Sequence, residues 1–84
     1  LPVLRDRKAI GKWAHAFSEA FEEFCKDLDA GRRTVMDPYG ATNPAEFFSV
    51  ATECFFEKAE QLEKEHPPLY RQLAKYYGLD PARW

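Results

Sequence analysis

The amino-acid sequence predicts an all-α fold of three helices, with one long ordered loop between the first and second helices. Apolar residues recur at intervals of three and four along most of the chain, which is the pattern of amphipathic helices. No stretch alternates between apolar and polar residues for long enough to indicate a strand. A chain of 84 residues has room for one domain, so we expect residues 1–84 to form a single unit.

The first helix is expected over residues 6–30. Six apolar residues follow one another at spacings of 4, 3, 4, 3 and 4, namely Ile10, Ala14, Phe17, Phe21, Phe24 and Leu28. Such spacing places them on one face of a helix. Asp6 is a suitable residue to cap the start of this helix, and Gly31 is a suitable residue to end it.

Residues 31–43 are expected to form the loop, because Asp37-Pro38 and Gly40 are typical of turns. The second helix is expected over residues 44–65. Asn43 is a favourable N-cap, Pro44 suits the first helical position, and Glu46 follows at the third, which is close to a capping box.

The third helix is expected over residues 67–77, directly after a His66-Pro67-Pro68 sequence that ends the second. Gly78 followed by the apolar Leu79 is a typical way for a helix to end. The last residues, 80–84, show no regular pattern and are expected to be irregular.

Composition excludes several classes of protein. The chain carries 12 basic and 14 acidic residues, so its net charge of −2 argues against nucleic acid as a main partner, and the Arg32-Arg33 pair is weak evidence for it. No apolar run is long enough for a membrane helix, and the first residues lack the pattern of a signal peptide. Cys25 and Cys54 lie on apolar stripes and are expected to be free thiols, as in a reducing cytoplasm.

Few residues suggest chemistry by their pattern alone. His15 lies four residues before Glu19, so the two side chains share a helix face; they are either a metal-binding pair or, more commonly, a solvated pair. His66 is expected to help begin the last helix. Glu46, at the third position of its helix, is by this reasoning alone a capping residue that favours the helix dipole.

One segment is more specific. Residues 39–48 read Tyr-Gly-Ala-Thr-Asn-Pro-Ala-Glu-Phe-Phe. This run resembles the segment that carries the third zinc ligand in the Mlc titration factor A family of zinc metallopeptidases, and a similar run occurs in the catalytic domain of anthrax lethal factor. The preceding tryptophan helix and the segments Pro67–Tyr70 and Tyr76–Pro81 agree with the same family, so the resemblance covers essentially the whole chain.

The resemblance implies roles for three residues. Glu46 matches the third protein ligand of a catalytic Zn²⁺, and Tyr39 matches a tyrosine that faces the substrate carbonyl and stabilises the oxyanion. Glu53 is either a hydrogen-bond acceptor for a zinc-bound histidine or a surface glutamate. Tyr39 is alternatively a loop tyrosine packed on Phe47 and Phe48.

The resemblance also implies that part of the site is elsewhere. The family's His-Glu-x-x-His helix, which supplies two zinc ligands and the general base, does not occur in these residues. We therefore expect the chain to be the C-terminal helical part of a larger zincin-like domain with a short sheet. The chain alone is expected to be inactive and to hold no catalytic Zn²⁺.

For the parent protein, the resemblance implies an aminopeptidase-type enzyme of the bacterial cytoplasm that acts on peptides. It also implies binding to the glucose repressor Mlc, and hence a link to glucose uptake. The alternative is a helical interaction module without catalysis. Seven Phe, four Tyr and two Trp exceed what a thin core needs, so some could mediate self-association.

Overall fold

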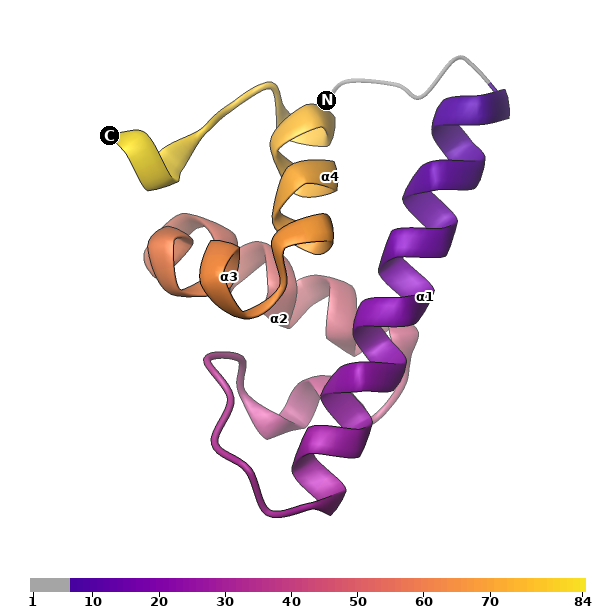
Figure 1. Cartoon of the computed structure of the whole chain (residues 1–84), viewed down its shortest axis with the longest axis vertical. Helices are drawn as coiled ribbons and strands as arrows, with labels where there is room; N and C mark the ends of the chain where they lie inside the picture. Colours follow the sequence, from indigo (N-terminus) through magenta and orange to yellow (C-terminus); the bar gives the residue numbers. More distant parts are fainter. Residues whose placement is uncertain (1–6) are drawn as a thin grey trace.

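The computed structural model describes residues 7–84, with side chains from residue 11 onward. Within that range the protein is all-α, as the sequence predicts, with no strand. Its elements in chain order are α1 (Arg7–Asp29), the 3-10 helix η1 (Pro38–Ala41), α2 (Pro44–Glu57), α3 (Ala59–Glu65), α4 (Pro67–Tyr77) and the 3-10 helix η2 (Pro81–Arg83) (Figure 1).

Helix α1 ends as the sequence predicts. Gly31 has a φ of +73°, in the left-handed region that suits glycine. The Gly31 N–H donates to the carbonyl of Leu28 at 3.0 Å, and the Arg32 N–H donates to the carbonyl of Asp27 at 2.9 Å. This pair of bonds is the Schellman motif, which satisfies the last carbonyls of a helix. The cap predicted at Asp6 lies outside the described residues.

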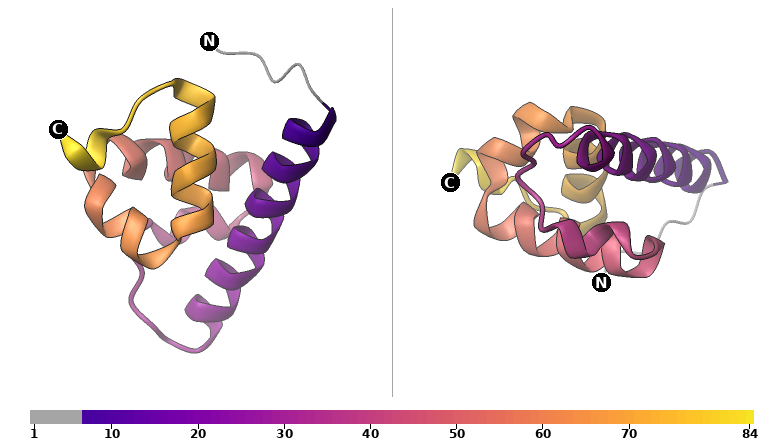
Figure 2. Two further views of the ribbon diagram at one scale, coloured as in Figure 1. Left: turned by 45° about the horizontal axis from the view of Figure 1, so that its top comes forward. Right: turned by 90° about the horizontal axis from the view of Figure 1, so that it is seen from below.

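The loop after α1 crosses from one side of the molecule to the other. Seen from below, it leaves the end of α1 and reaches η1 and α2 on the opposite side (Figure 2). Asn43 then starts α2 as predicted, because its side chain accepts a hydrogen bond from the Glu46 N–H at 2.9 Å. Pro44 occupies the first turn, where a missing N–H costs nothing.

The helix predicted over residues 44–65 is wrong in one respect: it is divided into α2 and α3 at Lys58. Lys58 has φ −135° and ψ 49°, which is not helical. Its N–H still bonds to the carbonyl of Cys54 at 2.7 Å, and its carbonyl accepts from Leu62 at 3.0 Å. The chain therefore changes direction at one residue while both ends remain hydrogen-bonded, and residues 7–84 contain four α-helices rather than three.

The C-terminal residues are more ordered than predicted. Helix α4 ends at Gly78, which has a φ of +68° and is followed by Leu79, as expected. Beyond it, residues 81–83 form η2. The Tyr70 hydroxyl donates to the Asp80 carboxylate and accepts from the Ala82 N–H, the latter at 3.0 Å. These bonds, formed by a side chain of α4, hold the tail against the helix.

The core is built from aromatic rings of α1, α2 and α4, together with apolar residues of α3. Phe47 of α2 is fully buried, and its ring lies 5.2–5.5 Å from the rings of Phe17, Phe21 and Phe24 on α1. Such edge-on and tilted contacts add to the hydrophobic gain of burial. Phe47 thereby fixes the first turns of α2 against α1, and Glu46 is its neighbour in the chain.

Candidate functional site

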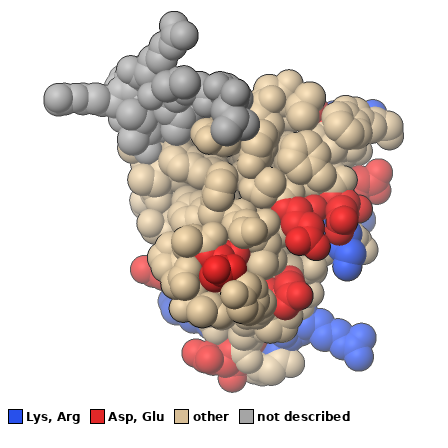
Figure 3. Space-filling model, turned by 180° about the vertical axis from the view of Figure 1, so that it is seen from behind, with Lys and Arg blue, Asp and Glu red and all other residues tan. Residues whose placement is uncertain are grey.

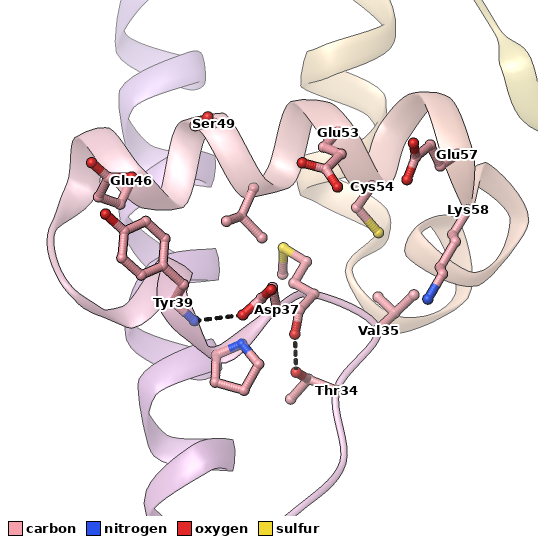
Figure 4. Close-up of a pocket in the computed structure, with 13 residues that line it drawn as sticks. Thr34, Val35, Asp37, Tyr39, Glu46, Ser49, Glu53, Cys54, Glu57 and Lys58 are labelled. Atoms are coloured by element: carbon pink, nitrogen blue, oxygen red, sulfur yellow. Dashed lines mark hydrogen bonds between the residues drawn. The ribbon is translucent and has the colours of Figure 1, made fainter.

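The candidate site is a cleft of about 580 Å³ between the loop at residues 34–39 and one face of α2. The residues of α2 that line it recur with helical spacing, so they share a face: Glu46, Ser49, Val50, Glu53, Cys54 and Glu57. Figure 4 shows the loop residues opposite them. The structure thus brings Tyr39, Glu46 and Glu53, the three site residues named from the sequence, to one cleft.

Glu46 is oriented by the cap of α2. Its backbone N–H is held by the Asn43 side chain, and the side chain itself is half-buried and lines the cleft. A full capping box would add a bond from the Asn43 N–H to the Glu46 carboxylate. No such bond is present among the described residues. The capping-box bond is therefore absent, although the Glu46 carboxylate still lies in the first turn of α2, where a negative charge favours the helix dipole.

Tyr39 lies in η1, which is capped by Asp37. The Asp37 carboxylate accepts from the Tyr39 N–H at 2.9 Å. The Tyr39 side chain is 58% exposed, and Figure 4 shows its hydroxyl end beside Glu46. Among the described aromatic pairs, Tyr39 stacks on neither Phe47 nor Phe48, so its ring is not part of the core.

Gly40 explains why η1 can approach the helices so closely. A Cβ at this position would lie 3.3 Å from Cε2 of Phe24 and 3.3 Å from Cβ of Val50. Both distances are tighter than ordinary contacts. A glycine here lets the backbone beside Tyr39 pack between α1 and α2, which positions the tyrosine at the mouth of the cleft.

Glu53 lies two helical turns after Glu46 on the same face and is exposed. The described residues offer its carboxylate no hydrogen-bond donor. The role predicted for it, as an acceptor for a zinc-bound histidine, stays a prediction.

Sequence reasoning missed further groups in this cleft. Asp37 and Glu57 bring the carboxylates that line it to four, and Lys58 is the one basic residue in the lining. Glu57 could have been placed in the cleft from the sequence, because it lies four residues after Glu53 and therefore on the same face of the helix. An acidic cleft of this kind favours a cation.

Cys54 is the thiol of the cleft, and it is free and buried, as predicted. Burial, which disfavours the charged thiolate, raises the pKa of the Cys54 thiol to about 11. Since the thiolate is the reactive form, Cys54 is not a nucleophile near neutral pH.

The two histidines of the chain lie outside the cleft. Nε2 of His15 is 3.1 Å from the Glu19 carboxylate, and both side chains are mostly exposed, which is a solvated pair. His66 is buried where α3 meets α4, and its carbonyl accepts the Tyr70 N–H as the first hydrogen bond of α4. A zinc centre at Glu46 therefore needs its histidines from outside this chain.

The face opposite to that of Figure 1 shows no sign of a nucleic-acid site over the described residues. Outside the grey atoms, Figure 3 shows several acidic groups there and no continuous basic patch. Arg32 forms an ion pair with Asp27, with 3.4 Å between Nη1 of Arg32 and Oδ1 of Asp27. Among the described helices, none is both long and apolar enough to cross a membrane.

Comparison with known proteins gives consistent results. A model of the family described as glucose-regulated metallo-peptidase M90 matches residues 1–78. An uncharacterised protein of Synechocystis is 44% identical over 81 residues, which cover 96% of this chain and 30% of the relative. The Mlc titration factor A proteins of Pectobacterium atrosepticum and Serratia proteamaculans are 40% and 38% identical, each over 93% of this chain and 29% of the relative.

No solved structure matches the chain. The chain spans about 30% of the length of the curated relatives named above. Because the family model matches residues 1–78 of the 84, the chain belongs to the glucose-regulated metallo-peptidase M90 family.

Proposed function

We propose that this chain is the C-terminal part of a zinc-dependent peptidase, to which it supplies the third protein ligand of the metal, Glu46, and an oxyanion-stabilising tyrosine, Tyr39. One observation carries the proposal: the Glu46 carboxylate stands in the first turn of α2, without a partner among the described residues, beside the hydroxyl end of Tyr39.

The residues of the cleft fit one side of such a centre. A catalytic zinc takes three protein ligands and keeps one position open. Glu46 provides one carboxylate ligand, and a His-Glu-x-x-His helix from the rest of the parent protein would provide the other two. A zinc ion held there supplies Lewis-acid chemistry, which polarises a peptide carbonyl and acidifies water.

The chain's own residues have three tasks in this proposal. Asn43 holds the first turn of α2, and so the direction of Glu46. The Tyr39 hydroxyl donates a hydrogen bond to the carbonyl oxygen of the peptide as that oxygen gains negative charge. Glu53 accepts a hydrogen bond from the free ring nitrogen of a ligand histidine, which keeps that ring in place.

The finer identity of the parent enzyme rests on the family resemblance of the sequence. From that resemblance we infer an aminopeptidase-type activity on peptides in the bacterial cytoplasm. The name Mlc titration factor A belongs to relatives at 40% and 38% identity, which supports binding to an Mlc-like repressor here as well. Self-association through the exposed aromatics, among them Tyr39, Phe56 and Trp84, stays a prediction.

Removing the metal tests the proposed function. We expect a chelator to abolish peptide hydrolysis by the longer protein that carries this chain, and added Zn²⁺ to restore it, because the Lewis acid is lost and regained. The measurement is release of product from a small peptide before and after dialysis. Full activity after complete removal of zinc would contradict the proposal.

Substituting Tyr39→Phe tests the tyrosine separately. The ring stays and only the hydroxyl is lost, so zinc content should not change. We expect kcat to fall about 10²-fold, which is the usual loss for one oxyanion donor. Zinc content by atomic absorption and kcat by peptide hydrolysis are the two measurements, and an unchanged kcat would remove Tyr39 from the mechanism.

A further inference from the structure

A second group of metal-ligating side chains lies away from the cleft, and its central member is His66. The His66 side chain is 98% buried, with 2% of its surface exposed, and its Nε2 atom has no hydrogen-bond partner among the residues whose side chains the structure describes. A buried polar atom left without a partner costs about 1–3 kcal/mol. Native proteins rarely keep such an atom without a reason.

Two carboxylates lie near the His66 ring. Oxygen atoms of Asp27 and Glu65 and a ring nitrogen of His66 lie within 4.8 Å of one another. Nε2 of His66 is 3.9 Å from Oε1 of Glu65, which is too far for a hydrogen bond. Three potential ligands from α1, α3 and the start of α4 therefore converge on one point.

The negative charge around Asp27 and Glu65 favours binding of a cation. Asp27 lies in the last turn of α1, where the helix dipole already places partial negative charge. Glu65 adds a second carboxylate close by. The nearest basic partner is Arg32, whose Nη1 stands 3.4 Å from Asp27 on a side chain that is 73% exposed, so it compensates this charge weakly.

We propose that Asp27, Glu65 and His66 form a structural site for a divalent transition metal, with Zn²⁺ as the best match. An imidazole beside two carboxylates suits zinc, whereas calcium and magnesium take oxygen ligands alone. Zinc–ligand bonds of about 2.0–2.2 Å require each of the three ligand atoms to move toward the metal by about 1 Å or less. The partly exposed Asp27 leaves room for water as the fourth ligand.

The proposed metal site is connected to the cleft through the side chain of Glu65. While Oε1 of Glu65 faces His66, Oε2 of Glu65 accepts the Val35 N–H at 3.0 Å. Val35 and the residues after it line the cleft up to Tyr39. A metal on Glu65 therefore fixes the carboxylate that anchors the start of this loop. Glu46 takes no part, so the inference does not depend on the proposed peptidase function.

The test is titration of the 84-residue chain with Zn²⁺ in competition with a chromophoric chelator. We expect His66→Gln and Asp27→Asn each to weaken zinc binding by at least about tenfold, which is the loss seen even when only a hydrogen-bond partner of a ligand is removed. His15→Gln and Glu60→Gln are the matched controls, since they remove the other histidine and an exposed carboxylate of α3, the helix that carries Glu65. Both controls should bind zinc as the wild type does.

Circular dichroism of each variant shows whether a loss of zinc binding comes from the loss of a ligand or from unfolding. Asp27 is partly exposed and Asn has the same shape, so Asp27→Asn should retain the helical content even if the buried His66→Gln does not. Zinc binding that survives in a folded Asp27→Asn chain, or that is lost in His15→Gln instead, would overturn the site. A folded wild-type chain that binds no zinc would equally overturn the site.

Discussion

Replacing Glu46 by Gln is expected to remove zinc from the catalytic centre of the longer protein and to lower its peptide hydrolysis by about a hundredfold or more. The substitution keeps the shape of the side chain but replaces an anionic ligand by a weakly donating amide. Loss of a mere hydrogen-bond partner of a metal ligand already costs about 10–100-fold, and Glu46 is proposed as the ligand itself. Zinc per protein by atomic absorption and hydrolysis of a small peptide are the measurements.

Glu57→Gln is the control for this substitution. Glu57 lines the same cleft from the same face of α2, at its other end, and its loss changes the net charge equally. We expect its zinc content and activity to stay at wild-type levels. Because the Asn43 cap is untouched in both variants, helix α2 should form in both. A Glu46→Gln protein with full zinc and full activity would show that the residue is only a helix-start glutamate.

Replacing Phe55 by Ala is expected to lower the free energy of unfolding of the 84-residue chain by about 3–5 kcal/mol. Phe55 is fully buried, and its ring lies 5.2 Å from that of Tyr70 and 5.8 Å from that of Tyr77. It therefore joins α2 to α4. Domains are stable by only about 5–15 kcal/mol, so this loss is a large share of the total. The measurement is urea denaturation followed by circular dichroism.

The neighbouring Phe56 supplies the control for Phe55. It is 42% exposed, and so less of its surface leaves water on folding. Phe56→Ala should cost clearly less than Phe55→Ala, although it removes the same number of atoms from the same helix. Equal effects of the two substitutions would mean that the arrangement of α2 against α4 differs from the one described.

The ends of the helices could be predicted because their signals are local. Asn43, Gly31 and Gly78 each act on residues within one turn, so a short stretch of sequence contains the whole cause. The break at Lys58 could not be predicted, since the apolar spacing continues through it: Phe55, Ala59 and Leu62 are all buried, at spacings of four and three. The change of direction depends on α3 packing against α4, which is a tertiary effect.

The candidate site likewise contains residues that could be predicted from the sequence and residues that only the fold brings together. Glu46 and Tyr39 lie seven residues apart, and both could be identified because the run between them resembles a segment of a known peptidase family. The cleft itself, with Asp37 and Glu57 in one lining, needs the loop folded onto α2. The cluster of Asp27 with Glu65 and His66 joins Asp27 to two residues that lie 38 and 39 positions later, and it follows from no local pattern.

The packing of Trp13 gives the chain an optical reporter of its own. Trp13 of α1 stacks on Tyr76 of α4 with 5.6 Å between ring centroids, whereas Trp84 is 79% exposed. Separation of the two helices would move the first indole into water and leave the second where it already is. The shift in tryptophan emission therefore follows the docking of α1 on α4, and a Trp84→Phe chain would report that event without background.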